Sequence, residues 1–386
     1  MRIIFFLLSP LLLFSETGLL KDSKKELLEI QRKEMNSKGD LIKNLWWGQL
    51  NLEGSYNWSD SKGKTDEFPN FTATISQDIF RSGGIYWQIR KGKLYKNLNQ
   101  TLLDKKEQDL VFNLYKLVLN INKLDIGIEK QRLTITNQNI LIKNLKDKYI
   151  NGVIDISILD ESIIQLNSLK NGEEGIIQTR IDLIANLRDI TNLDYTQINI
   201  PKFETFSIQE FLEKNIDLNV QTQLIEQMRV DKNLAYSNYL PRVSLYGSYQ
   251  YEDSDNFQNE KDSHRYGVKI SIPIGFNMGG AFETAQATYL RSKSELTDKQ
   301  ENQKNIYSRI ISKLESIDRR VKNSEELIES YLSIYEITKE YYESDLKTED
   351  DVTILKNRVD ISKFDLDIYN IDKKITKLLL YQAVFR

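Results

Sequence analysis

The sequence of 386 residues contains no cysteine and a single histidine, His264. Disulfides and thiolate metal sites are therefore excluded. A single histidine also leaves almost no residues for a histidine metal cluster or a Ser–His catalytic arrangement. No glycine-rich loop that could cradle a phosphate is present either. We therefore predict that the protein is not an enzyme, with no catalytic residue, no metal and no cofactor.

Proline is also scarce, and the chain has no excess of positive charge. A proline inside a helix costs about 3 kcal/mol, and none of the five lies within a long helical pattern, so long uninterrupted helices are allowed. The formal net charge of −3 offers no basic surface for nucleic acid, which we exclude as a partner. The prolines are Pro10, Pro69, Pro201, Pro241 and Pro273.

Long hydrophobic runs are missing except at the N-terminus. Arg2 is followed by an almost wholly apolar run from Ile3 to Phe14 and then by Ser15. This pattern predicts a secretory signal peptide over residues 1–15. The run is shorter than the roughly 20 residues of a transmembrane helix. If the protein enters a membrane, we expect it to do so without transmembrane helices.

The chain repeats one plan twice. The pairs Gly83–Gly84 and Gly279–Gly280 each follow an alternating segment, each precede a long helical pattern, and lie 196 positions apart. Internal repetition of this kind fixes the architecture before any motif does. We assign residues 16–200 to a first repeat and 201–386 to a second.

Each repeat is expected to contain two strands. Over 49–59, apolar and polar residues alternate, which indicates a strand with one apolar and one polar face. Similar alternation predicts strands at 69–79, 241–251 and 265–274. On the first strand the apolar face consists of Leu50, Leu52, Gly54, Tyr56 and Trp58.

Each repeat is also expected to contain a long helical hairpin. After Gly84, apolar residues recur at alternating spacings of four and three, the heptad seam of a coiled coil. The pattern predicts hairpins over 84–190, turning at Asn151–Gly152, and over 280–384, turning near 345–350. Shorter helices are expected at 18–47 and 207–239, with a connector from 191. The seam of the first hairpin begins with Leu110, Leu114, Leu117, Ile121, Leu124 and Ile128.

The fold class predicted is mainly α with a small β part. Four strands of about ten residues are long enough to cross an outer membrane but cannot close a barrel, and lipid does not tolerate open strand edges. If the strands are embedded, the chain must oligomerise. Two copies would give eight strands and three would give twelve, and the strands alone do not choose between them.

Four segments resemble the TolC-type outer-membrane efflux proteins, or outer-membrane factors. They are Gln77–Gly84, Tyr149–Ile156, Leu240–Val243 and the segment from Ile270 to Gly280. The resemblance covers essentially the whole mature chain. It implies a homotrimer, with a twelve-stranded β-barrel in the cell outer membrane and an α-helical tunnel in the periplasm.

The same resemblance implies a function and its partners. Family members are passive channel subunits of tripartite efflux or type I secretion systems. A periplasmic adaptor protein and an inner-membrane pump dock at the far end of the tunnel, while outer-membrane lipid surrounds the barrel. The energy for transport then comes from the pump.

The resemblance also implies a periplasmic gate at the second hairpin turn, formed by Tyr342, Lys347 and Asp351. Lys347 departs from the arginine of the family and cannot form its bidentate contacts. An acidic mouth is expected from Asp345, Glu349 and Asp350, although carboxylates at a helix start also occur as ordinary solvated groups. The adaptor-docking tips implied by the resemblance are Asn151, Gly152, Val153 and Leu346.

An alternative is a periplasmic coiled-coil adaptor or a structural protein of the envelope. Such an adaptor would have one hairpin flanked by all-β domains, whereas this chain has two hairpins in a duplicated frame. The channel interpretation therefore fits the sequence better.

Overall fold

A computed structural model describes residues 16–61, 64–253 and 262–384, so the expected signal peptide lies outside the described residues. The chain forms two compact units. One comprises the described parts of 1–28, 105–216 and 302–386, and the other comprises 29–104 and 217–301.

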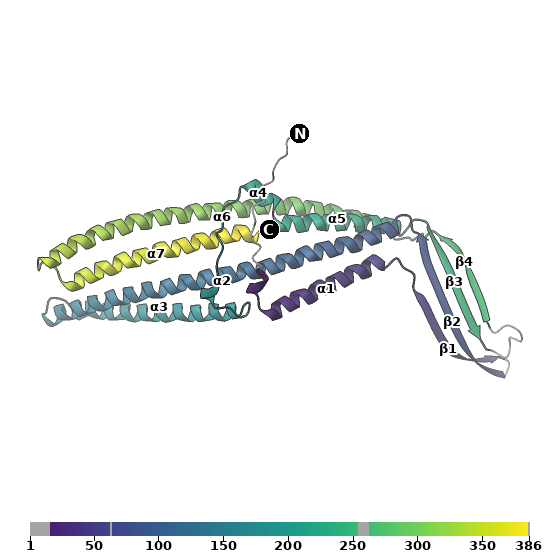
Figure 1. Ribbon diagram of the computed structural model, residues 1–386, viewed down its shortest axis with the longest axis horizontal. Coiled ribbons are helices and arrows are strands. Elements are labelled where there is room, and N and C mark those ends of the chain that lie inside the picture. The colour runs from purple at the N-terminus through teal and green to yellow at the C-terminus, as the bar shows by residue number, and fades with distance from the viewer. Residues whose placement is uncertain (1–15, 62–63, 254–261, 385–386) are drawn as a thin grey trace, which may run out of the picture. The chain divides into compact units, whose positions relative to one another are not determined.

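The fold class predicted from the sequence is confirmed: most of the chain is helical, and four strands form one antiparallel sheet (Figure 1). Two short 3-10 turns, η1 and η2, lie at Glu16–Leu19 and Tyr195–Gln197. The strands are β1 (Leu50–Ser61), β2 (Lys64–Phe80), β3 (Arg242–Glu252) and β4 (Asp262–Ser271). The helices are α1 (Asp22–Asn44), α2 (Gly84–Ile150), α3 (Ile156–Arg188), α4 (Ile208–Glu213), α5 (Ile216–Ser237), α6 (Met278–Glu343) and α7 (Glu349–Gln382).

Several element boundaries differ from the sequence prediction, and two of the differences have an identifiable reason. β2 begins at Lys64, before the strand predicted from residue 69, because backbone pairing with β1 continues to the Ser61–Lys64 pair. The helix expected over 207–239 is divided into α4 and α5. The break lies at Asn215, which forms an isolated bridge with Val384.

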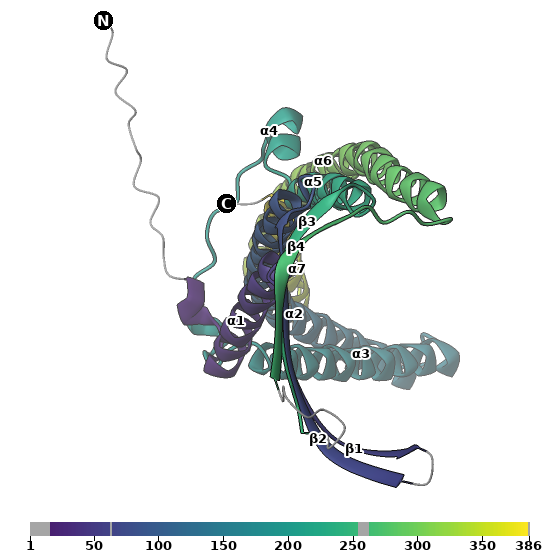
Figure 2. The same cartoon turned by 90° about the vertical axis from the view of Figure 1, so that its right-hand side faces the viewer.

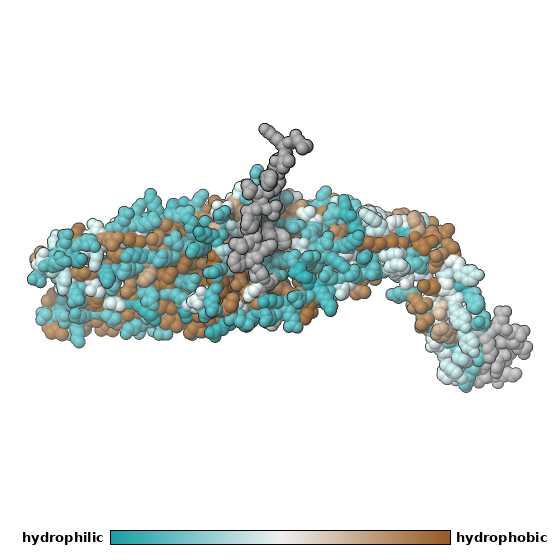
Figure 3. Space-filling model, in the orientation of Figure 1, coloured by the Kyte–Doolittle hydropathy of each residue, from teal (hydrophilic) through white to brown (hydrophobic). Residues whose placement is uncertain are grey.

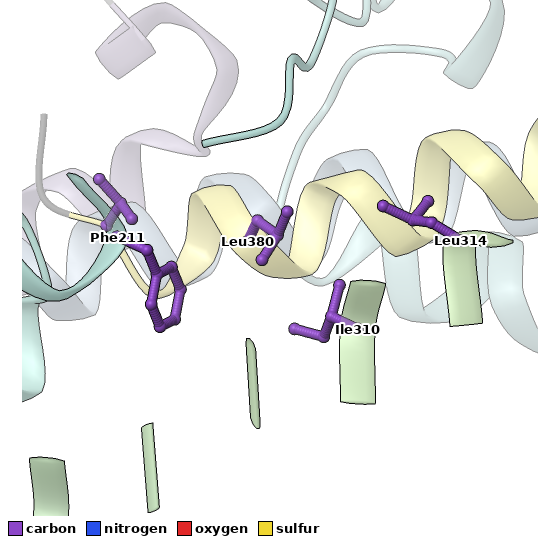
Figure 4. Close-up of a cluster of buried hydrophobic side chains, with 5 residues drawn as sticks. Phe211, Ile310, Leu314 and Leu380 are labelled. Carbon is purple, nitrogen blue, oxygen red and sulfur yellow. The ribbon is translucent and has the colours of Figure 1, made fainter. Parts of the chain in front are cut away.

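The unit that contains 105–216 and 302–386 is built from two helical hairpins, α2 with α3 and α6 with α7. Leu114, Leu117 and Ile121 of the predicted α2 seam are buried. A second cluster joins α4 to α6 and α7, with Phe211 packed near Ile310, Leu314 and Leu380 (Figure 4). The heptad seam therefore supplies the core that holds the helices together.

The other unit contains the sheet, whose strands are ordered β1-β2-β3-β4 and lie in one curved layer (Figure 2). Paired residues of antiparallel strands point to the same face, so the register defines the two faces. Leu52 pairs with Ala73, Ala73 with Tyr249, and Leu245 with Val268, all on one face. The opposite face carries Asn51, Glu53, Thr72, Thr74, Ser248, Gln250 and Lys269.

Much apolar surface is left uncovered by the chain itself. On the face shown in Figure 3, apolar side chains are interspersed with polar ones along the helices. Along the strands, Trp58, Tyr266 and Val268 are all exposed. Among the helices of the described ranges, none has both the length and the apolar content of a membrane span.

Candidate functional site at the turns of the helical hairpins

The two hairpins are copies of one structural unit, displaced by 193 positions. In the first, Gln131 Nε2 donates to the Leu169 carbonyl at 2.7 Å, and in the second, Ser324 Oγ donates to the Ser362 carbonyl at 3.4 Å. Both members of the second bond lie 193 positions after those of the first. This correspondence allows any contact of one hairpin to be compared with the other.

An ion pair between the helices follows the same rule. Asp125 of α2 pairs with Arg180 of α3, and Asp318 of α6 pairs with Lys373 of α7 at 2.6 Å. Both members of the second pair are again displaced by 193 positions. The repeat thus preserves the chemistry of the contact even where the residue type has changed.

The turns that end the hairpins have the same backbone geometry. Gly152 has a φ of +68° and Asp345 a φ of +58°, both in the left-handed region. After each, the backbone N–H of Val153 or Leu346 reaches back to the carbonyl of Lys148 or Tyr341, at 2.8 Å in both turns. This is the Schellman arrangement that ends a helix.

The residue after the left-handed position projects from each turn. Val153 is 68% exposed and Leu346 is 71% exposed. Of the four docking residues expected from the sequence, Val153 and Leu346 therefore occupy equivalent places in the two turns. Gly152 is equivalent to Asp345, and Asn151 precedes it. Each turn therefore exposes an apolar side chain at this position.

A capping box follows the second turn and engages Asp351. Asp351 Oδ2 accepts hydrogen bonds from the Thr348 backbone N–H at 3.1 Å and from the Thr348 hydroxyl at 2.9 Å. In return, the Asp351 N–H donates to Thr348 Oγ at 3.2 Å. These hydrogen bonds, the backbone one above all, and the charge of Lys347 lower the pKa of the Asp351 carboxyl. Its carboxylate therefore stabilises the start of α7.

The three residues expected to form a gate lie around the same turn. Tyr342 is in the last turn of α6 and Lys347 precedes the cap, both with exposed side chains. Within the part of the chain that the structure describes, Tyr342, Lys347 and Asp351 form no side-chain hydrogen bond or ion pair with one another. Any network among them would have to involve other groups.

The expected acidic mouth includes one carboxylate that is already paired. Asp350 Oδ2 lies 3.0 Å from Lys143 Nζ of α2, while Asp345 and Glu349 are exposed. The hydrogen bond and the charge of Asp350 raise the pKa of Lys143. This pair joins the two hairpins close to their turns, and Lys143 was not among the residues predicted.

The pair is the last rung of a ladder between antiparallel α2 and α7. Lys123 bonds Asp372 at 2.7 Å, and Lys130 bonds Asp365 at 2.5 Å. A step of seven residues along α2 matches a step of seven back along α7, as heptad packing requires. The next rung is an amide pair, in which Asn357 Nδ2 donates to Asn137 Oδ1 at 2.8 Å. The ladder sets the register of the two hairpins.

Across the described ranges, no group of three or more histidine, cysteine, aspartate or glutamate side chains has a geometry that could hold a metal ion.

The sequence matches no protein-family model and no curated protein. Solved structures nevertheless match nearly the whole chain. The outer membrane protein VceC of Vibrio cholerae is 14% identical, with 93% of each chain covered and a TM-score of 0.73. The CmeC outer membrane channel of Campylobacter jejuni is 14% identical, with 95% of this chain and 84% of that one covered and a TM-score of 0.72.

The open state of the MtrE outer membrane channel of Neisseria gonorrhoeae is 12% identical, with 93% of this chain and 85% of that one covered and a TM-score of 0.68. The predicted resemblance in fold is thus confirmed, because these structures each cover at least 93% of the chain. The chain has the fold of the TolC-type outer-membrane channels.

Proposed function

We propose that the protein is a passive channel subunit of the cell outer membrane, which serves a tripartite efflux or type I secretion system. Three copies would close a twelve-stranded barrel in the membrane and a helical tunnel in the periplasm. One observation carries the proposal: a sheet with one apolar and one polar face, and with two open edges, belongs to the same chain as two equivalent helical hairpins.

The two faces of the sheet support a membrane position. In a barrel, the face with Leu52, Tyr249 and Val268 would contact lipid, and the face with Glu53, Thr74 and Lys269 would line water. β1 and β4 each pair with one strand of the described chain and keep one edge open. Further copies would pair those edges, since lipid cannot satisfy their backbone groups.

The turns support a role at the periplasmic mouth. A periplasmic adaptor would contact the projecting Val153 and Leu346, and an inner-membrane pump would deliver substrate through it. Tyr342, Lys347 and Asp351 would form the gate. The channel MtrE has been seen in an open state, which supports the idea that proteins of this fold open and close.

Bilayer recording tests the channel function directly. The purified full-length protein, inserted into planar lipid bilayers, should produce discrete conductance steps and should migrate as a trimer in detergent. The same preparation after heat denaturation is the control. A monomer that fractionates with periplasmic proteins and gives no conductance would contradict the proposal and favour the adaptor alternative.

The gate assignment has its own test. Asp351→Ala and Asp351→Asn should both weaken channel block by a divalent cation at the periplasmic side, because both remove the charge. Asp155→Ala, at the corresponding helix start of the first hairpin, is the matched control. Block that persists in both Asp351 variants would restrict Asp351 to helix capping.

A further inference from the structure

Two cations on the last strand of the sheet have no carboxylate partner. Lys269 and Arg265 of β4 are exposed, and neither side chain forms an ion pair or a hydrogen bond within the described ranges. Their neighbours on β3 are serines, since Ser244 pairs with Lys269 and Ser248 pairs with Arg265. Both cations belong to the polar face of the sheet, because alternate residues of a strand share a face. They can therefore contact a solute on that face.

A tyrosine lies between the two cations. Tyr246 of β3 pairs with Gly267, which is midway between Arg265 and Lys269 on the same face. A Cβ added to Gly267 would come within 2.8 Å of the Tyr246 hydroxyl and 2.9 Å of its ring carbons. The ring therefore lies over Gly267, and a larger residue at that position would displace it. This close contact gives a reason for a glycine in the interior of β4.

The three side chains offer hydrogen-bond donors at one place on the face. Ammonium and guanidinium groups donate and cannot accept, and a phenol hydroxyl can donate as well. Tyr246 is 40% exposed, so its hydroxyl is within reach of a solute. Lys269 and Arg265 are four residues apart on β4, or about 13 Å at the rise of a strand, and both side chains are long enough to reach toward the tyrosine. Such a group attracts an anion.

A hollow on the sheet adjoins this group of donors. The sheet is curved (Figure 2), and the hollow has a volume of about 910 Å³. Among the described residues that line it, Lys269 alone is charged. A hollow of this size has room for a small organic anion. The polar side chains that line it with Lys269 and Tyr246 are Gln49, Asn51, Thr74, Ser76 and Ser248.

The carboxylates of the same face do not neutralise the two cations by direct contact. Asp78 of β2 shares a row with Lys269, but Ser244 lies between them and donates its hydroxyl to Asp78 Oδ1 at 2.6 Å. Two strand spacings separate their backbones by about 10 Å, which exceeds the Debye length of about 8 Å at physiological salt. Glu53 and Glu252 lie in rows farther from the helices than either cation. Positive charge is thus concentrated near the helices.

We propose that Lys269, Arg265 and Tyr246 form an anion-binding site on the polar face of the sheet, for solutes that carry a phosphate or carboxylate group. The proposal rests on the proposed function, which places this face in the wall of a water-filled pore. Three copies would repeat the site around the pore, and rings of lysine or arginine are a means by which channels favour anions. The site would make anionic solutes the favoured cargo of the barrel.

Block of single-channel current by inorganic pyrophosphate tests the site. Pyrophosphate, added to each side of a planar bilayer in turn, should block potassium chloride current through the wild-type channel. Lys269→Gln and Arg265→Gln remove a charge but keep a long polar side chain, and each should raise the half-blocking concentration by about fivefold. Lys269→Arg and Arg265→Lys keep the charge and should retain most of the block.

A variant of opposite sign is the matched control. Glu53→Gln removes one negative charge from the same face and should not raise the half-blocking concentration. Block of the wild-type channel should also weaken as the potassium chloride concentration rises, since exposed charges are screened by salt. A half-blocking concentration that rises as much in Glu53→Gln as in Lys269→Gln would contradict a site built from the two cations.

The two proposals fail in different ways. A conducting wild-type trimer that pyrophosphate does not block, or one whose block is unchanged in Lys269→Gln and Arg265→Gln, would overturn the anion site and leave the channel function intact. A wild-type protein without conductance or oligomer would overturn the channel function itself, and the anion site in the pore wall with it.

Discussion

At the scale of single residues, the two hairpin turns place different side chains in the same left-handed backbone position. Glycine adopts this conformation without strain, whereas most other residues do so at a cost of roughly 1–2 kcal/mol. Gly152 satisfies the position in the first turn, and Asp345, a residue that tolerates it better than most, satisfies it in the second. The second turn has thus gained a charge and retained the same backbone.

We predict that Asp345→Val destabilises the second turn by about 1–2 kcal/mol, because a β-branched side chain disfavours a positive φ. Asp345→Gly should change stability by less than about 1 kcal/mol, since relief of strain and added freedom of the unfolded chain oppose each other. Amide hydrogen exchange of Asp345 and Leu346 provides the measurement. Equal protection in the two variants would show that the backbone at this turn is not strained.

The Asp351 cap predicts a dependence on pH. Because the folded-state pKa of this carboxyl is lowered, its contribution is present above the unfolded value of about 3.9 and is lost as the pH falls through the folded value. At pH 7, Asp351→Ala should destabilise α7 by about 1 kcal/mol. The difference in unfolding midpoint between wild type and variant, followed by circular dichroism, should shrink below pH 4. A difference that stays constant down to pH 2.5 would contradict this role.

At the scale of elements, the equivalent ion pairs of the two hairpins, Asp125–Arg180 and Asp318–Lys373, differ in their further contacts. Arg180 Nη2 donates to Tyr195 Oη at 3.0 Å while its guanidinium pairs with Asp125, and Tyr195 Oη donates to Asp125 Oδ2 at 3.1 Å. In the second hairpin, Lys373 occupies the corresponding place. A planar guanidinium can contact two groups at once, and this contact ties η2 to the first hairpin.

We therefore predict that Arg180→Lys keeps the pairing with Asp125 but loses the bond to Tyr195. Hydrogen exchange of the amides from Thr196 to Ile198 should become faster, with little change along α3. Lys373→Arg in the second hairpin is the matched control and should leave these amides unchanged. If Arg180→Lys has no effect there, the tyrosine is held by its aspartate alone.

The sequence was sufficient for elements whose signal is periodic. The heptad spacing from Leu110 to Ile128 predicted a helix and its buried side, and the alternation around Leu52 predicted a strand with two faces. The start of β2 was harder to predict, because residues 64–67 are polar and resemble a loop until their pairing with β1 is known. Spacing can indicate a strand but cannot show how far a hairpin extends.

The ladder of contacts between α2 and α7 could not be predicted from the sequence for a related reason. Lys123, Lys130 and Lys143 look like solvated lysines in a helical pattern, and nothing local shows that α7 lies opposite them. The seven-residue spacing of Lys123 and Lys130 was a usable signal only in combination with the aspartates of α7. Asp351 was predicted as a site residue, but the sequence could not separate its two roles. A capping box and a gate carboxylate both require an aspartate at this position.

At the scale of the whole molecule, the sheet must be completed by other chains if the proposed function is correct. The two faces of the sheet should then differ in how well they tolerate charged side chains. Side chains that face lipid cannot carry a charge near the bilayer centre, whereas side chains that face a water-filled interior can.

We predict that Val268→Arg reduces the recovery of membrane-inserted trimer, since an arginine on the lipid face near the bilayer midplane costs about 2–4 kcal/mol. Thr74→Arg, which adds the same charge on the polar face, should insert as well as wild type. Trimer recovered from the outer-membrane fraction in detergent measures both. Equal recovery would argue that the apolar face does not contact lipid.

The pairing of β2 with β3 has a consequence for how the protein is made. Ile75 and Gly247 are neighbours in the sheet although one belongs to each half of the chain. If the protein is exported as the proposed function requires, the first half reaches the periplasm with a β-hairpin whose inner edge must wait for the second half. During that interval the edge is a target for aggregation, and closing such a long loop is slow. Biogenesis of this protein should depend on a chaperone that shields the early hairpin until translocation is complete.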